Sequence, residues 1–186
     1  TINVRAAFAC ADARRLPLAD GSVHMIATSP PYFGLRAYAT GEHKAAEIGA
    51  ESLHDCLAWA RGEEPCGACY VCHLREWAAE MWRVLRNDGV MFLNLADSYA
   101  TNGGRHLNTP TNTRNREAGH SDQPNNKPLP GLKPKNLIGI PWRVALALQA
   151  DGWILRSAIV WQKPNNLPES VTDRPTKSHE DIFLLA

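Results

Sequence analysis

The sequence lacks any long hydrophobic run and any marked excess of charge. No apolar stretch among its 186 residues approaches the ~20 that span a membrane, and the N-terminus lacks the charged-then-apolar pattern of a signal peptide. A net charge of +1 is not the strongly basic balance of a protein that holds nucleic acid mainly through its phosphates. We therefore expect a cytoplasmic protein with no membrane association.

Cysteine is also scarce, with five residues in a chain that is 44% hydrophobic and 21% charged, an ordinary composition for one globular domain. A chain of this length can cover roughly 70% of its unfolded surface, so folding requires neither disulfides nor metal. The chain begins at Thr1 without a Met, and its last residues, Ile182–Ala186, form an apolar run typical of a strand that is cut short. We expect a fragment of a longer protein.

The stretch from Val23 to Tyr32 organises the rest of the chain. Residues 23–28 have the length and β-branched content of a buried strand, and Pro30 has no N–H with which to continue a ladder, so the strand ends at Ser29. Ligands bind at the carboxyl ends of strands in open α/β sheets. Two prolines beside an aromatic ring then predict a pocket for a flat group that carries an amine. A plain strand followed by a Pro-Pro turn is the alternative.

The remaining periodicity predicts an α/β sheet that is mostly parallel, with a late antiparallel pair. Apolar residues at intervals of three and four predict a helix over residues 70–86, which the turn at residues 87–89 ends. Asp12 would follow the carboxyl end of the first strand, although an isolated Asp is equally typical of a cap or turn. The other expected elements are strands over residues 2–10, 90–95 and 153–161, a helix over 142–150, and a final strand after residue 180.

A cysteine-rich stretch lies at about residues 52–73. Cys66, Cys69 and Cys72 form a C-x-x-C-x-x-C pattern, and Cys56 precedes them by ten positions. Four thiols can close a tetrahedral zinc site, which would brace the fold without taking part in catalysis. Unliganded cysteines are the main alternative, and an iron–sulfur cluster is disfavoured because no fourth cysteine is followed by proline.

A polar stretch at about residues 101–136 predicts a long surface loop. It is rich in Asn, Pro, Gly and Thr and has little apolar content. Its cations make it the best candidate for tracking a DNA backbone, although a solvated linker with incidental charge is an equal alternative. The candidate DNA-binding residues are Arg105, Arg114, Arg116, Lys127, Lys133 and Lys135.

At Ser29-Pro30-Pro31-Tyr32 the chain resembles the amino-group DNA methyltransferases, whose catalytic motif is Asp, Asn or Ser, then Pro-Pro, then an aromatic residue. Further stretches resemble the later motifs of that family in the same order, so the resemblance covers nearly the whole chain. These are the strand that leads to Asn94, Asp97 and Ser98, the Gly139–Arg143 stretch, Trp161-Gln162-Lys163-Pro164-Asn165, and His179-Glu180.

The resemblance implies a site-specific DNA methyltransferase that uses S-adenosylmethionine, as in restriction–modification systems. A base flipped out of double-stranded DNA would stack on Tyr32, and its exocyclic amine would donate hydrogen bonds to the Ser29 side chain and the Pro30 carbonyl. Ser29 and Pro30 would also line the cofactor, and Asp12 would contact its adenosyl part. Serine at the first motif position favours cytosine N4 over adenine N6 as the methyl acceptor.

One family feature is missing, since no Gly-x-Gly occurs anywhere in the sequence. In the β group of the family, the glycine motif that wraps the methionine part of the cofactor lies after the His-Glu strand. We therefore expect residues 1–186 to be the catalytic part of one Rossmann-like methyltransferase domain that is incomplete at its C-terminus, with the cofactor-binding segment in the same or another chain. The resemblance also implies that the cysteine-rich stretch at about residues 52–73 is an insertion, because that region of the family is usually a plain connection into a helix. The alternatives are a non-catalytic DNA-binding or scaffolding fragment that needs a partner, and a zinc-bound interaction module.

Overall fold

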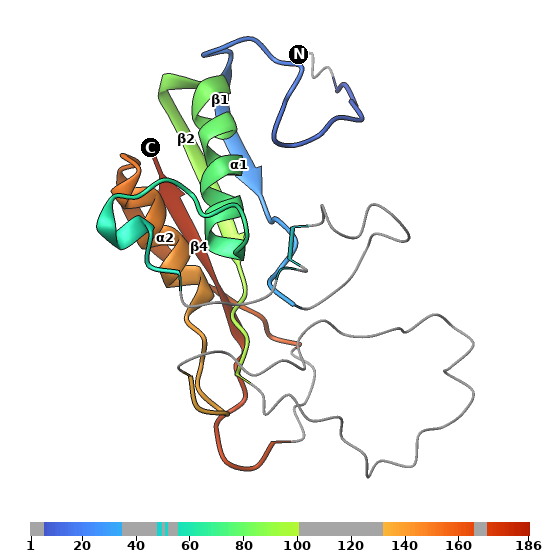
Figure 1. Cartoon of the computed structure of the whole chain (residues 1–186). Coiled ribbons are helices and arrows are strands. Elements are labelled where there is room, and N and C mark those ends of the chain that lie inside the picture. Colours follow the sequence, from blue (N-terminus) through green and yellow to red (C-terminus); the bar gives the residue numbers. More distant parts are fainter. Residues whose placement is uncertain (1–5, 35–47, 50, 52–55, 101–131, 166–170) are drawn as a thin grey trace, which may run out of the picture.

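The structure is a computed structural model that describes residues 6–34, 48–49, 51, 56–100, 132–165 and 171–186. Two α-helices pack on a four-stranded sheet (Figure 1). Within the described residues, no helix is both long and apolar enough to cross a membrane. In chain order the elements are β1 (Val23–Thr28), the 3₁₀ turn η2 (Trp59–Arg61), α1 (Tyr70–Val84), β2 (Leu85–Leu95), α2 (Ile140–Ala150), β3 (Leu155–Gln162) and β4 (His179–Leu185).

The strands lie in the order β1-β2-β4-β3. β1 and β2 run parallel with α1 in the crossover between them, whereas β4 is antiparallel to both of its neighbours, β2 and β3. The expected α/β class and late antiparallel pair are confirmed. The expectation of a mostly parallel sheet is wrong for the described strands, because β4 inserts between β2 and β3. This order brings the start of β4 next to the carboxyl ends of β1 and β2.

The helix and strand predicted at residues 70–95 are confirmed with one changed boundary. α1 ends at Val84, and β2 begins immediately at Leu85, because Leu85 pairs with Val23 of β1. The next pair is Met25 with Val90, so residues 86–89 oppose the single residue His24. The predicted turn at residues 87–89 is therefore a bulge within β2, not a break between helix and strand.

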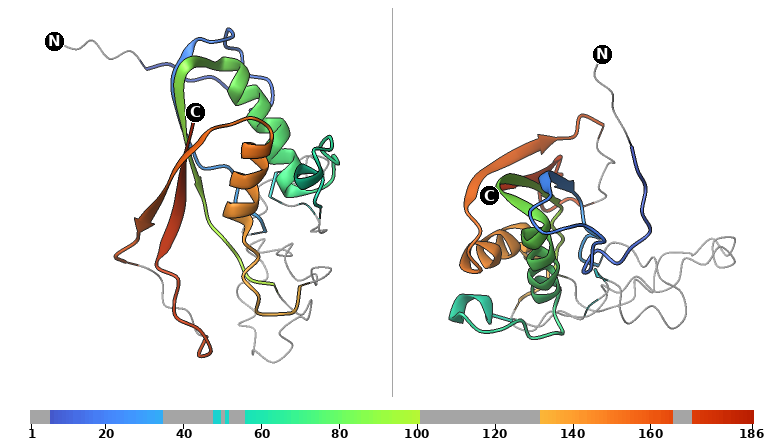
Figure 2. Two further views of the ribbon diagram at one scale, coloured as in Figure 1. Left: turned by 90° about the vertical axis from the view of Figure 1, so that its left-hand side faces the viewer. Right: turned by 90° about the horizontal axis from the view of Figure 1, so that it is seen from above.

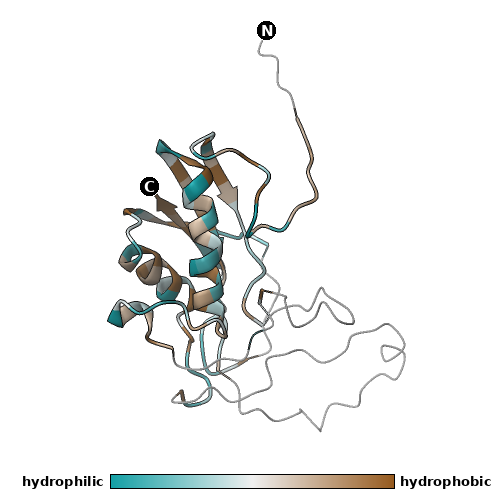
Figure 3. Ribbon diagram, turned by 45° about the horizontal axis from the view of Figure 1, so that its top comes forward, coloured by the Kyte–Doolittle hydropathy of each residue, from teal (hydrophilic) through white to brown (hydrophobic). Residues whose placement is uncertain are grey.

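The two faces of the sheet differ sharply. Both helices lie on the same side of it (Figure 2), and the strands carry much of the hydrophobic colouring (Figure 3). The side chains beneath the helices are almost inaccessible: Met91, Leu93, Leu95, Phe183 and Leu185. The opposite face is also apolar but only partly covered, and its members are Met25, Val90, Phe92, Ile159, Ile182 and Leu184. We call this second surface the open face.

Two predictions about the first strands are wrong in the described residues. Residues 6–10 are exposed and form no strand, and Phe8 is fully exposed. Nothing in the described sheet pairs with them, since β1 has β2 as its single neighbour. β1 itself is an edge strand and not a buried one, and its Met25 is 58% exposed.

A short clasp joins the end of β2 to the start of α2. The backbone of Ala100 exchanges hydrogen bonds with the 135–136 stretch, at 2.8 Å each, and the N–H of Ile138 donates to the Ser98 carbonyl at 2.9 Å. The Asp97 carboxylate accepts from the backbone N–H groups of Gly139 and Ile140, the first of which is the N-cap residue of α2. The two ends of the stretch between residues 100 and 132 are thus held close together.

Candidate functional site

The Ser29–Tyr32 motif follows the carboxyl end of β1, where side chains from all four described strands or their extensions meet. The Ser29 hydroxyl donates to the Tyr32 hydroxyl at 3.0 Å, and the Tyr32 hydroxyl donates to Glu180 Oε2 at 2.9 Å. Asn94 on β2 donates from Nδ2 to both the Tyr32 hydroxyl, at 2.8 Å, and Glu180 Oε2, at 3.0 Å. Lys163 pairs with the other oxygen of Glu180. The sheet order therefore fixes the Tyr32 hydroxyl from two neighbouring strands.

Glu180 is the anchor of this network. It is 9% exposed, and burial alone would raise the pKa of its carboxyl. The hydrogen bond from Lys163, followed by those from Asn94 and Tyr32, outweighs burial and lowers that pKa below its usual range. Glu180 is thus a carboxylate at neutral pH, and a carboxylate can only accept hydrogen bonds.

The direction of each hydroxyl proton follows from that charge. Because Glu180 only accepts, the Tyr32 O–H must point at it, and the Tyr32 oxygen is left to accept. The Ser29 O–H then points at the Tyr32 oxygen. Ser29 Oγ consequently keeps its lone pairs for an external donor, which is the polarity that an amine requires.

The proline part of the motif is held from the start of α1. The Tyr70 hydroxyl donates to the Pro31 carbonyl at 2.8 Å, and burial raises the pKa of Tyr70, which keeps this hydroxyl protonated. The Phe33 ring, 3% exposed, packs edge-on against the Tyr70 ring with centroids 5.5 Å apart. Phe33 therefore belongs to the core.

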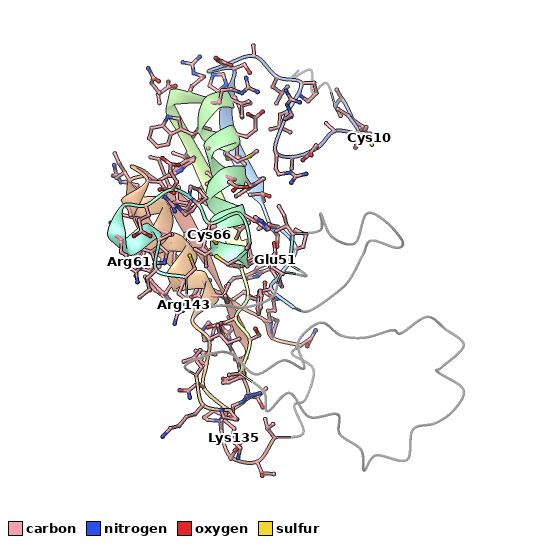
Figure 4. The ribbon with its side chains drawn as sticks, viewed as in Figure 1. Cys10, Glu51, Arg61, Cys66, Lys135 and Arg143 are labelled. Atoms are coloured by element: carbon pink, nitrogen blue, oxygen red, sulfur yellow. The ribbon has the colours of Figure 1, made fainter. Side chains whose placement is uncertain are left out.

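The structure brings together the four cysteines predicted as metal ligands. Their Sγ atoms lie within 4.8 Å of one another, and all four are free thiols. Burial raises the pKa of the Cys69 and Cys72 thiols. Burial also acts to raise the pKa of Cys66, but hydrogen bonds from the Ala68 backbone and the other three thiols lower it to about 6. Cys10 lies in the N-terminal segment, far from this cluster (Figure 4).

The remaining predicted site residues are not gathered at the motif. Asp12 is exposed and bonds to Arg14, whose backbone N–H and guanidinium both donate to its carboxylate. Lys133 is exposed, and Lys135 pairs with Asp173 next to the clasp. Arg105, Arg114, Arg116 and Lys127 lie outside the described residues. The structure thus joins Ser29 and Tyr32 by a hydrogen bond, whereas the side-chain bonds of Asp12 go to Arg14.

Sequence reasoning singled out the His179-Glu180 and Lys163 motifs but gave them no role. The contact of Glu180 with Tyr32 depends on β4 lying beside β2, a pairing that local periodicity does not specify. The available signal was charge placement, since a Glu at the start of an apolar strand needs a buried partner.

A family model described as "DNA methylase" matches residues 23–186. Among curated proteins, the Type II methyltransferase M.Cfr9I of Citrobacter freundii is 47% identical over 174 residues, which cover 92% of this chain and 50% of that protein. The Type II methyltransferase M.SmaI of Serratia marcescens is 46% identical over 163 residues, which cover 87% of this chain and 48% of that protein. The chain therefore spans about half the length of these relatives.

Solved structures agree at the level of the fold. The PvuII DNA methyltransferase, described as cytosine-N4-specific, matches with a TM-score of 0.54 and 14% identity over 95% of this chain and 47% of its own. A putative DNA modification methylase from Thermus thermophilus, complexed with S-adenosyl-L-methionine, matches with a TM-score of 0.51 and 16% identity over 94% of this chain and 52% of its own. Together with the match at residues 23–186, these findings show that the chain has a Rossmann-like methyltransferase sheet and belongs to the DNA methylase family of amino-group methyltransferases.

Proposed function

We propose that this chain carries the acceptor side of a site-specific DNA methyltransferase that methylates the exocyclic amine of a flipped base. The observation that carries the proposal is the fixed polarity of the Ser29–Tyr32–Glu180 network, in which the Ser29 hydroxyl donates a hydrogen bond to Tyr32 and its oxygen can accept one. The names of the Type II relatives support a paired restriction–modification role for the complete protein.

In this proposal the base stacks on the Tyr32 ring, which its hydroxyl contacts hold in place. The amine donates one hydrogen bond to Ser29 Oγ and another to the Pro30 carbonyl, and these two acceptors aim the nitrogen lone pair away from the protein. Holding a nucleophile in this way supplies much of the rate of a direct transfer because the reactants are already aligned. The stacked geometry requires the base to leave the duplex, where the amine is inaccessible.

S-adenosylmethionine supplies the methyl group as a sulfonium. The transfer forms the N–C bond, breaks the S–C bond, leaves a neutral thioether and releases one proton from the amine. The chain fits only the acceptor part of this reaction. The Asp12 carboxylate is bonded to Arg14, and the sequence has no Gly-x-Gly turn to hold the methionine end of the cofactor. Ser29, Pro30 and Asp12 stay candidate contacts for the cofactor.

We infer that cytosine N4 is favoured over adenine N6 as the acceptor. Serine at the first motif position supports this choice, as does the similarity in fold to an enzyme described as cytosine-N4-specific. Mass spectrometry of nucleosides from DNA modified by the complete protein tests it directly. N4-methylcytosine is the expected product, and N6-methyladenine would contradict the choice of base while leaving the reaction class intact.

The apolar open face is an argument for a second half of the domain, outside this chain, that would cover it. Sheets in α/β folds are covered by helices on both faces, whereas the two helices among the described residues lie on one. A cofactor-binding segment packed on the open face and against the free edge of β1 would complete the sheet. It would bring the missing glycine turn to the same end of the sheet as Ser29. Double-stranded DNA would then be contacted by the basic 101–136 stretch, including Lys133 and Lys135.

The test uses single substitutions in the complete protein. Ser29→Ala and Tyr32→Ala are each expected to lower methyl transfer to duplex DNA by about 10²-fold or more, because alignment of the amine is lost. Thermal unfolding and duplex affinity should change little, apart from the roughly 1–3 kcal/mol of base stacking that Tyr32 provides. Ser157→Ala, on the exposed strand β3, is the matched control and should retain full activity. Unchanged turnover in both motif variants would refute the assignment.

A titration of residues 1–186 with the cofactor tests the division of the site. We expect binding in the millimolar range or weaker, no methyl transfer by this chain alone, and restored activity when the remaining segment is supplied in the same or a second chain. Tight stoichiometric binding by residues 1–186 would show that the glycine turn is dispensable.

A further inference from the structure

Four thiols meet just before and within the first turn of α1. The Sγ atoms of Cys56, Cys66, Cys69 and Cys72 all lie within 4.8 Å of one another. Those of Cys56 and Cys72 are 3.7 Å apart, too far for a disulfide, whose sulfurs are about 2.05 Å apart. Zinc–sulfur bonds of about 2.3 Å in a tetrahedron place the sulfurs roughly 3.8 Å from one another. The spacing of this cluster is therefore that of ligands around one zinc ion.

The chemistry of the ligand set agrees with the spacing. Four thiolates select zinc over metals that prefer oxygen, and a closed set of four protein ligands is typical of a structural site. Cysteines that hold a four-iron cluster stand farther apart, because they surround a cube of iron and sulfide. Two of the four residues, Cys69 and Cys72, are buried, whereas Cys56 is partly buried and Cys66 is exposed.

We propose that Cys56, Cys66, Cys69 and Cys72 bind one zinc ion, and that this ion fixes the start of α1 and, through it, the loop that presents Ser29–Tyr32. The ion would join the stretch before η2 to the first turn of the helix. The metal site stands independently of methyl transfer, whereas the effect on the loop rests on the proposed function.

Two connections run from the zinc ligands to the loop. Cys69 is the N-cap of α1, and Tyr70, which follows it, donates to the Pro31 carbonyl at 2.8 Å. His73, next to Cys72, pairs through Nδ1 with Glu51 Oε1 at 2.8 Å.

The second connection continues from Glu51 into the loop. Glu51 accepts from the Gly49 N–H at 2.7 Å, and the Gly49 carbonyl accepts from the Gly34 N–H at 2.8 Å. A Cβ at Gly49 would lie 3.2 Å from the Tyr32 carbonyl oxygen and 3.3 Å from Pro31 Cβ, so the backbone there touches the motif directly. Movement of the first turn of α1 would therefore be transmitted to both sides of the Pro-Pro turn.

The first experiment measures metal in the complete protein purified without added zinc. We expect about one zinc per chain in the wild type and in Cys10→Ser, whose cysteine is exposed and lies outside the cluster, and loss of zinc in Cys69→Ser. Because Cys69→Ser could unfold, cobalt is also exchanged into the wild type. Intense thiolate-to-cobalt absorption with the bands of a tetrahedral tetrathiolate site supports the proposal. Absence of bound metal in the wild type, or a cobalt spectrum without thiolate bands, would overturn it.

The second experiment tests the connection to the loop with Tyr70→Phe. This variant keeps the buried ring but loses the bond to the Pro31 carbonyl, so zinc content should be unchanged and kcat should fall roughly tenfold, the equivalent of one hydrogen bond. The KM for DNA should change less than kcat, because phosphate contacts are untouched. If Tyr70→Phe keeps the wild-type kcat, the proposed connection to the loop is refuted, whereas the proposed metal site is unaffected.

The two proposals fail in different ways. A protein with zinc and tetrathiolate cobalt bands that never methylates DNA would retain the metal site and refute the proposed function. A protein that methylates DNA normally and contains no metal would refute the metal site and retain the proposed function.

Discussion

The two faces of the sheet are built from alternate residues of the same strands, yet one face is fully buried and the other is only partly covered. Leu93 on β2 is fully buried beneath the helices, while Met25 on β1 faces the open side and is 58% exposed. The residues are apolar on both sides, so composition does not explain the contrast; the placement of helices on one side does. The comparison teaches that the strands carry apolar residues on both faces, which is the pattern of a sheet that is covered on both faces.

The largest effect should come from truncating the covered face. In residues 1–186, Leu93→Ala removes a fully buried side chain and is expected to lower the free energy of unfolding by about 2–5 kcal/mol. Met25→Ala should change it by about 0.5 kcal/mol or less. Urea unfolding of both variants measures the difference. In the complete protein Met25→Ala should become clearly destabilising if the open face is covered there, and an equally small effect in both contexts would mean that it stays exposed.

Arg75 tests how the two helices are held together on the covered face. Its guanidinium forms a two-point ion pair with Asp151 at the end of α2, at 2.6 and 2.7 Å, and a third bond to the Glu63 carbonyl. Arg75→Ala should cost about 3 kcal/mol, since it leaves a partly buried carboxylate without its partner.

The matched control for Arg75 is Arg86→Ala, which breaks an exposed pair with Asp88 in the β2 bulge. That substitution should lower the thermal midpoint far less than Arg75→Ala, because solvent screens exposed ion pairs. Thermal unfolding of the two variants provides the comparison. Equal costs would indicate that the Arg75 pair contributes no more than a surface contact.

The smallest expected effect is a pH dependence in the connection between α1 and the segment before β1. The hydrogen bond from Arg83, followed by that from the Leu16 N–H, lowers the pKa of Glu80 from 4.5 to about 2. Because the folded pKa lies below the unfolded one, the stabilisation from this carboxylate is complete above about pH 4.5 and is lost as the pH falls toward 2. Glu80→Gln should flatten that part of the stability curve, whereas Glu76→Gln should not. Parallel curves for wild type and Glu80→Gln would contradict this.

Several elements were predictable because their signals are local. Pro30 ends a strand by its chemistry, and the spacing of apolar residues from Tyr70 to Val84 specifies an amphipathic helix. The boundary at Leu85 was not predictable, since it depends on pairing with Val23 across the crossover. The strand expected at residues 2–10 failed over 6–10 because a strand also needs a neighbour, and the described sheet offers none.

The candidate site divides in the same way. The motif at Ser29–Tyr32 and the four cysteines were found from residue type and spacing. The role of Glu180 was not, because Glu180 contacts Tyr32 from 148 positions away through the insertion of β4 beside β2. Nothing in the local pattern around either residue encodes that contact.

The clasp between Ser98–Ala100 and Asn136–Ile138 has a consequence for how the family can diversify. Because both ends of the intervening segment are fixed by Asp97 and by backbone bonds of the clasp, its length can change without displacing β2 or α2. The entropy of closing a loop grows slowly, and each doubling of its length costs only about 0.6 kcal/mol. New segments can therefore be exchanged at this point for little loss of stability. If the 101–136 stretch contacts DNA as proposed, DNA target preference would evolve separately from the motif at Ser29.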